Sequence, residues 1–153
     1  MNAQQIILVI VGIFVAQALL WFVLSRWLKK KTEALKGKLA EQQKRAKEKF
    51  LIEPQSALYR GADATFGNVK GNGVICLTGK GLVFEKITGQ RIELARGDMA
   101  EARVEKSFKG KTSTGTGGRH LVINAKDGNR IGFLIKNAED WAQKINALLE
   151  STR

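Results

Sequence analysis

The feature that most constrains this chain is an N-terminal stretch without charge. The first 25 of the 153 residues contain no Asp, Glu, Lys or Arg, and residues 6–24 read IILVIVGIFVAQALLWFVL. As a helix, these 19 residues would extend about 28 Å, which is close to the roughly 30 Å hydrocarbon core of a bilayer. We therefore predict a transmembrane helix over residues 6–28, preceded by a short external N-terminus of residues 1–5.

Two other interpretations of this stretch fit the residues less well. A cleavable signal peptide has basic residues before an apolar region of about 7 to 15 residues, and small residues at its cleavage site. Here residues 1–5 contain no Lys or Arg, and the longer apolar run is followed by bulky Trp27 and by Lys29. A buried helix of a soluble protein is also disfavoured, because residues 50–153 could not surround a helix that is apolar on every face.

The charges beside the apolar run predict its orientation. Residues 26–49 hold ten basic and three acidic side chains. Because Lys and Arg beside a span stay on the cytoplasmic side, we expect an inner-membrane protein with its N-terminus outside and residues 26–153 in the cytoplasm. The lone Cys76 agrees with a reducing compartment. The indole and basic side chains expected at the membrane interface are Trp21, Arg26, Trp27, Lys29, Lys30 and Lys31.

The segment that follows, residues 29–53, is a basic neck that we predict to be helical. It is rich in Ala, Leu, Glu, Lys and Gln, which favour helices. Pro54 disfavours helix in the residue before it, so the helix is expected to end near Ile52 or Glu53. A stripe at heptad spacing comprises Leu28, Thr32, Leu35, Leu39, Gln42 and Ala46. This stripe leaves two interpretations open, a solvated spacer helix and a weak homodimer through the neck.

The remaining residues, 54–153, show the pattern of short strands followed by one helix. The strongest strand signals are residues 74–78 with 82–85 and residues 120–125 with 131–135, each pair joined by a Gly-containing turn. A final amphipathic helix is expected to begin after Asn137. Its apolar face comprises Trp141, Ile145, Leu148 and Leu149. We therefore expect about seven antiparallel strands and one C-terminal helix.

Several segments of this domain follow one another in an order found in a known superfold. Residues 73–84 read GVICLTGKGLVF, and they are followed by Ile92 with Leu94, by a hairpin from Leu121 to Phe133, and by Trp141. This order resembles the pleckstrin-homology (PH) superfold, particularly its GRAM-like and bacterial PH-like domains, over roughly residues 56–150. The resemblance implies a partly open barrel capped by the C-terminal helix.

What the resemblance implies about ligands is less specific. Domains of this superfold bind phosphoinositide headgroups, peptides or other proteins, and the fold does not choose among them. Members that bind lipid generally use basic residues on the loop between the first two strands. Here residues 67–73 contain only Lys70, which argues against a specific phosphoinositide site.

The best candidate for a binding site is the basic segment 106–119. Lys106, Lys109, Lys111 and Arg119 flank a tract of Gly, Ser and Thr, whose N–H and hydroxyl donors suit a phosphate or an acidic peptide. A flexible, solvated strand connection is the alternative interpretation. A nucleotide-binding P-loop is rejected, because position 105 is Glu105 where that motif requires glycine.

The other reactive side chains do not form a catalytic or metal-binding pattern. The single His120 and Cys76 both lie in predicted strands and are expected to be buried, and Arg96-Gly97-Asp98 is expected to be a turn. The carboxylates Glu85, Glu93, Asp98, Glu101 and Glu105 are interpreted as surface charge. We therefore predict a protein that is not an enzyme and has no catalytic residues, metal or cofactor.

The net charge of +12 raises the question of nucleic-acid binding. We do not expect it, because +7 of that charge lies in residues 26–49 and the domain does not interleave aromatic with basic residues.

Two functions remain. The first is a membrane-anchored, non-catalytic module that recruits or scaffolds a cytoplasmic protein. The alternative is a sensor of anionic lipid or of a phosphorylated ligand through residues 106–119. A protein scaffold should expose an apolar groove or an unpaired strand edge, whereas a lipid sensor should gather its basic residues on one face.

Overall fold

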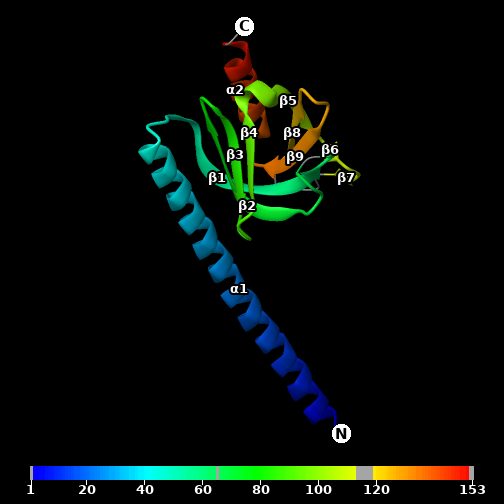
Figure 1. Ribbon diagram of the computed structural model, residues 1–153. Coiled ribbons are helices and arrows are strands. Elements are labelled where there is room, and N and C mark those ends of the chain that lie inside the picture. The colour runs from blue at the N-terminus through cyan, green and yellow to red at the C-terminus, as the bar shows by residue number, and fades with distance from the viewer. Residues whose placement is uncertain (1, 65, 113–118, 152–153) are drawn as a thin grey trace. The chain divides into compact units, whose positions relative to one another are not determined.

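A computed structural model of the chain describes residues 2–64, 66–112 and 119–151. It divides into two compact units, Met1–Ala34 and Leu35–Arg153 (Figure 1). The first unit is helical throughout its described length, from Ala3 onward, and the second contains the end of that helix and all the strands.

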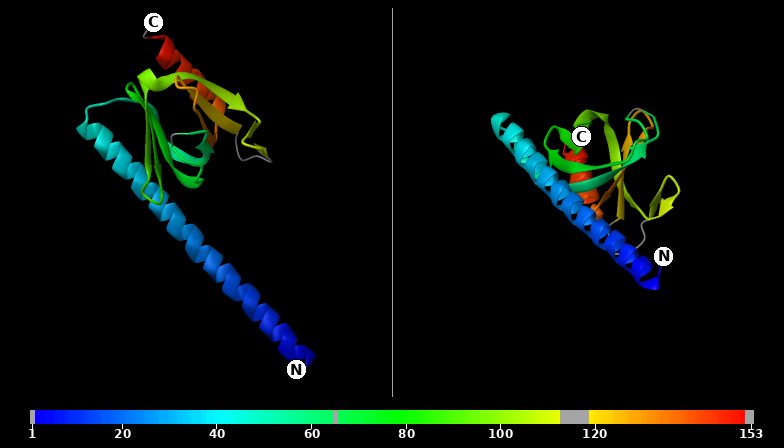
Figure 2. Two further views of the ribbon diagram at one scale, coloured as in Figure 1. Left: turned by 45° about the vertical axis from the view of Figure 1, so that its right-hand side comes forward. Right: turned by 90° about the horizontal axis from the view of Figure 1, so that it is seen from below.

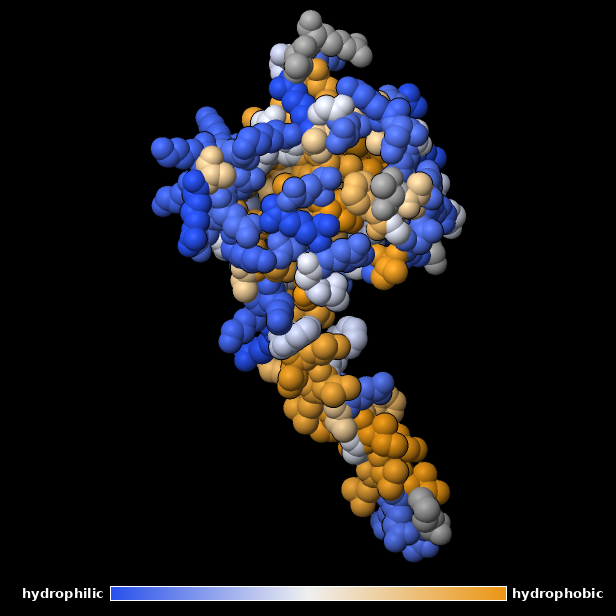
Figure 3. Space-filling view, in the orientation of Figure 1, coloured by the Kyte–Doolittle hydropathy of each residue, from blue (hydrophilic) through white to orange (hydrophobic). Residues whose placement is uncertain are grey.

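Helix α1 spans Ala3–Arg45 and contains the predicted transmembrane segment. From Gln4 it is long and apolar enough to cross a membrane, and none of its most apolar 18-residue window is buried. Figure 3 shows these apolar side chains in orange at the surface. The predicted interface residues Trp21 and Trp27 are 74% and 50% exposed. The Arg26 guanidinium lies 4.8 Å from the centre of the Phe22 ring, so it can extend along an apolar surface.

The second unit, Leu35–Arg153, is built on one seven-stranded antiparallel sheet with the strand order β4-β3-β2-β1-β9-β8-β5. The strands are β1 Phe50–Ala62, β2 Gly71–Thr78, β3 Gly81–Lys86, β4 Arg91–Ala95, β5 Met99–Glu105, β8 Arg119–Ala125 and β9 Arg130–Ile135. A separate two-stranded ribbon comprises β6 Ser107–Phe108 and β7 Lys111–Thr112, and a short 3-10 helix, η1, spans Arg96–Asp98. The C-terminal helix α2 spans Ala138–Glu150.

The sheet encloses one apolar core and α2 closes it (Figures 1 and 2). Strand β1 pairs with β2 on one side and β9 on the other, and so joins the two halves of the sheet. The rings of Tyr59, Phe84 and Phe133 meet in the core at centroid distances of 5.3 to 5.9 Å. Trp141 of α2 is fully buried among them in the same cluster. The prediction of a long apolar helix, a partly open PH-like barrel and one C-terminal helix is confirmed.

The predicted end of the neck helix is wrong. Helix α1 ends at Arg45, and β1 begins at Phe50, before Pro54 rather than after it. The strand tolerates Pro54 because β1 pairs only with β2 at that point, and its register shifts between Ile52 and Gln55. A proline that lacks a backbone N–H fits such an irregularity without breaking a regular ladder.

Candidate functional site

The C-terminal part of α1, residues 35–45, packs against the outer face of β2 and β3. In β2, Ile75 and Leu77 face the core, so Val74, Cys76 and Thr78 face the opposite side. These three outer residues are nevertheless at most 1% exposed, and Thr78 lines the same groove as Leu39, Gln42 and Gln43 of α1. Leu39 of α1 is itself 1% exposed.

This packing corrects both interpretations of the heptad stripe. The stripe residue Leu39 is neither solvated nor available to a second copy, because it is buried within its own unit. The other stripe residues in this part of the chain are less buried: Leu35 is half-buried, whereas Gln42 and Ala46 are exposed.

An ion pair reinforces the packing and corrects a second prediction. Lys38 Nζ donates to Glu85 Oε1 at 2.7 Å, and Arg91 Nη1 lies 4.0 Å from Glu85 Oε2. The Glu85 side chain is only 4% exposed, although its place in β3 suggested surface charge. No local pattern indicates its burial, since its partner Lys38 in α1 lies 47 positions away in the chain. The remaining carboxylates of that set, Glu93, Asp98, Glu101 and Glu105, are exposed or half-buried as expected.

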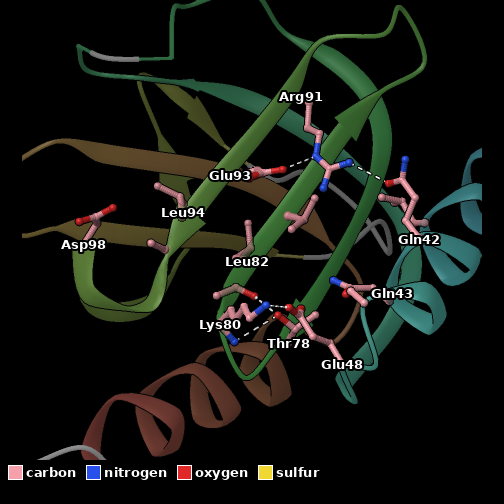
Figure 4. Close-up of a pocket in the computed structure, with 15 residues that line it drawn as sticks. Gln42, Gln43, Glu48, Thr78, Lys80, Leu82, Arg91, Glu93, Leu94 and Asp98 are labelled. Carbon is pink, nitrogen blue, oxygen red and sulfur yellow. Dashed lines mark hydrogen bonds and ion pairs between the residues drawn. The ribbon is translucent and has the colours of Figure 1, made fainter.

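A groove of about 640 Å³ lies between the C-terminal part of α1 and strands β3 and β4 (Figure 4). Its apolar lining comes from Leu39, Ala46, Leu82, Val83, Leu94 and Ala95. At one end Arg91 reaches from β4 to α1, where its Nη1 donates to Gln42 Oε1 at 2.8 Å, and it also pairs with Glu93. Another part of the rim is the ion pair of Lys80 with Glu48. The groove is therefore apolar inside and charged at its rim.

Strand β4 forms one wall of this groove and is an edge of the sheet. Two backbone bonds fix its pairing with β3, Lys86 N–H to the Gln90 carbonyl and Arg96 N–H to the Lys80 carbonyl. Antiparallel pairs alternate between bonded and non-bonded, so Ile92 and Leu94 bond to β3. The backbone groups of Arg91, Glu93 and Ala95 therefore point away from β3. Among the described residues, no strand pairs with that side of β4.

The opposite edge of the sheet, β5, is covered. Asn146 of α2 places its side-chain amide on Ala102: its Oδ1 accepts from the Ala102 N–H at 2.8 Å, and its Nδ2 donates to the Ala102 carbonyl at 2.9 Å. These bonds occupy both backbone groups that an added strand would use at this residue. The two edges of the sheet are thus unequal, and β4 is the more available one.

The predicted basic segment is arranged differently from a set of free cations on one face. Lys109 Nζ donates to the Ala62 carbonyl and to Asn68 Oδ1, both at 2.5 Å, and lies 3.4 Å from Asp63. Arg119 pairs with Glu139 of α2 at 3.1 Å. Lys106 is exposed, and Lys111 lies in β7. Lys109 is therefore directed to the end of β1 and the β1–β2 loop, whereas Arg119 is directed to α2.

The hairpin β6–β7 within this segment was not predicted. Its two turn residues, Lys109 and Gly110, both have positive φ, 49° and 69°, as two-residue hairpins of the I′ type require. The glycine in second position was the signal available in the sequence. The tract at residues 113–118, where phosphate donors were expected, lies outside the described residues.

A second lysine, Lys86, is buried at the end of β3 next to the β1–β2 loop. Its side chain donates to the Val69 carbonyl and to Gln90 Oε1, both at 2.6 Å, and its Nζ lies 4.7 Å from the centre of the Tyr59 ring. Desolvation by burial lowers the pKa of Lys86. The protein's own oxygen atoms thus occupy the donors of this cation.

His120 and Cys76 are buried, as predicted from their strand positions. Burial raises the pKa of the Cys76 thiol to about 11, which leaves it protonated and a poor nucleophile. Burial and then the Arg60 charge lower the pKa of His120, whose Nε2 accepts from Arg60 Nε at 3.3 Å. Within residues 2–64, 66–112 and 119–151, no three His, Cys, Asp or Glu side chains lie together as a metal site would require.

Comparisons with known proteins add little to this geometry. No model of a known protein family matches the sequence, and no curated protein matches it. Among solved structures, the chain is similar to the C-terminal domain of an unknown protein from Leishmania infantum, with 15% identity, a TM-score of 0.48, and coverage of 74% of this chain and 94% of that one.

Two further solved structures are also similar to this chain. One is the pleckstrin homology domain of USP37, with 13% identity, a TM-score of 0.47, and coverage of 62% of this chain and 97% of that one. The other is Vav1 inhibited by an allosteric inhibitor, with 10% identity, a TM-score of 0.44, and coverage of 65% and 27%. Similarities of this size carry no statement about the function of this chain.

Proposed function

We propose that this protein is a single-pass, membrane-anchored interaction module that recruits or scaffolds a cytoplasmic protein and has no catalytic activity. Residues 6–28 cross the inner membrane, with residues 1–5 outside. The second unit, residues 35–153, which we call the β-domain, lies in the cytoplasm. Trp21, Arg26, Trp27 and the lysines at 29–31 lie at the interface, where each cation gains about 1 kcal/mol from anionic headgroups. Residues 54–153, the predicted PH-like domain, provide the binding surface together with the end of α1.

The observation that carries this proposal is the free edge of β4 beside an apolar groove. An unpaired strand edge is a liability that proteins usually cover or blunt. Here Asn146 covers the β5 edge at Ala102, whereas no strand within residues 2–64, 66–112 and 119–151 pairs with the outer side of β4. An unequal treatment of the two edges supports binding of a protein at β4.

The alternative function, a sensor of anionic lipid or a phosphorylated ligand through residues 106–119, has less support. Lys109 and Arg119 already bind oxygen atoms of the same domain, including carboxylates of Asp63 and Glu139. An anionic headgroup would have to displace these partners. Lys106 is exposed and could act without such a displacement.

Photo-crosslinking in living cells tests the proposal. A benzoylphenylalanine at position 95, on the free β4 edge, should give a discrete covalent adduct with a cytoplasmic protein in the membrane fraction. The matched control places the same group at Arg103 of β5, whose side chain is 64% exposed. No adduct from position 95, or the same adducts from both positions, would refute recruitment through this surface.

Sedimentation of residues 35–153 with vesicles would distinguish the lipid sensor from the protein scaffold. Binding that requires anionic lipid, survives physiological salt and disappears when Lys106, Lys109, Lys111 and Arg119 become alanine would support the sensor. Binding seen only at low salt would be screened, nonspecific attraction.

A further inference from the structure

We infer that the partner binds as an extended peptide that adds a strand to the free edge of β4, with apolar side chains in the groove and acidic residues at its flank. This inference rests on the proposed function and specifies the chemistry of the partner. It is carried by the backbone geometry of β4, the lining of the groove and the charges of α1.

The backbone of β4 specifies an extended chain as the ligand. Arg91, Glu93 and Ala95 each direct one N–H and one carbonyl away from β3. An extended peptide offers the complementary donors and acceptors at the same spacing, whereas a helix has satisfied its own. The three residues are also the exposed ones in β4, so side-chain burial does not block the approach.

The groove specifies what the side chains of that peptide should be. Side chains of a strand alternate between its two faces, so every second residue of an added strand points toward the face that carries the groove. The accessible apolar side chains on that face are Ala46 beside the end of α1, Val83 of β3 and Ala95 of β4. Apolar residues, two positions apart, therefore fit there.

The end of α1 specifies the charge at the flank. Lys44, Lys47 and Lys49 are exposed and lie in the chain beside the groove residues Gln43, Ala46 and Glu48. The neighbouring carboxylates are already paired within the domain, Glu41 with Arg45 and Glu48 with Lys80. The α1 rim of the groove is thus positive, and an acidic residue in the peptide would be complementary to it.

A second copy of this chain is a poorer occupant of the same edge. Antiparallel pairing of two β4 strands about their centre would place Glu93 opposite Glu93, and like charges directly opposite each other are destabilising. The occupant that fits is a different chain.

A backbone substitution tests the inference directly. Glu93→Pro removes the outward N–H at the centre of the edge but no bond to β3, since a proline is tolerated where the N–H faces away from the sheet. Glu93→Ala is the matched control, because it removes the same side chain and keeps the N–H. Both are made in the full chain, held in nanodiscs of neutral phosphatidylcholine.

The probe is a nonapeptide selected on the wild-type protein from a random display library. We expect the selected sequences to share apolar residues two positions apart and an acidic flank. By fluorescence anisotropy, wild type and Glu93→Ala should bind the peptide within about threefold of each other, and Glu93→Pro about thirtyfold more weakly. Methylation of every second backbone nitrogen of the peptide should weaken its binding to the wild-type protein by a similar factor. This second measurement does not depend on whether Glu93→Pro folds.

Each result is decisive. Binding by Glu93→Pro equal to that by Glu93→Ala, unchanged binding of the N-methylated peptide, or a selection without peptides of this kind would overturn strand addition. An adduct from position 95 in cells would still support recruitment in those cases, so the two proposals fail separately. Formation of a dimer on light scattering, lost in Glu93→Pro, would identify a second copy as the occupant and overturn the inference.

Discussion

Truncation of Leu39 measures how much the C-terminal part of α1 contributes to the stability of the β-domain. Leu39 is 1% exposed, and Leu→Ala changes at buried sites cost about 2 to 5 kcal/mol. Because Leu39 also lines the groove, the space left behind would join the groove and fill with water rather than remain an empty cavity. We therefore expect Leu39→Ala to lower the free energy of unfolding by about 2 to 3 kcal/mol. Alanine is a good helix former, so the helix itself is not weakened.

The assay is urea unfolding of the full chain in detergent micelles, followed by tryptophan fluorescence. The chain has three tryptophans, and replacing Trp21 and Trp27 by phenylalanine leaves the buried Trp141 as the reporter. The expected loss corresponds to a decrease in the midpoint of about 1 to 2 M urea. Leu51→Ala, at a side chain that is 41% exposed, is the control and should cost less than about 1 kcal/mol.

A free energy of unfolding for Leu39→Ala within about 0.5 kcal/mol of wild type would refute the packing of α1 on the sheet. Dependence of the wild-type midpoint on protein concentration would instead indicate that the heptad stripe joins two copies.

Three further predictions concern the β-domain. Burial lowers the pKa of His120, so the imidazole binds a proton more readily in the unfolded chain than in the folded one. The folded state should therefore lose stability as the pH falls from 6.5 toward the lowered pKa. The urea midpoints at pH 7.5 and 5.0 should differ less in His120→Gln than in wild type. Lys47 has a φ of 53°, so Lys47→Gly should raise the free energy of unfolding by about 0.5 to 1 kcal/mol in the same titration. A Cβ on Gly132 would collide with the Phe108 ring, so Gly132→Ala should cost about 2 kcal/mol on thermal unfolding, while Gly97→Ala, in open space with ordinary φ, should be neutral.

The elements whose cause is local can be derived from the sequence alone. An uncharged run of apolar residues can be stable as a helix long enough to cross a membrane whatever follows it, and the face of α2 with Trp141 and Ile145 must be buried against something. The hairpin at Asp127-Gly128 depends on turn residues adjacent in the chain, and β8 and β9 pair around it as predicted. Periodicity and turn chemistry act over a few residues, so they can be read without the fold.

Which surfaces are covered depends on contacts between segments that are distant in the chain. Glu85 is buried and Leu39 is part of the domain because α1 packs on the outer face of β2 and β3, a contact between segments far apart in the sequence. In the same way, Asn146 covers the edge of β5, and nothing among the described strands covers β4. A strand's own residues do not reveal whether it lies at an edge, because that depends on the order in which the whole chain assembles the sheet. The candidate binding surface consists of such an edge and such a contact, and for that reason it could not be predicted from the sequence.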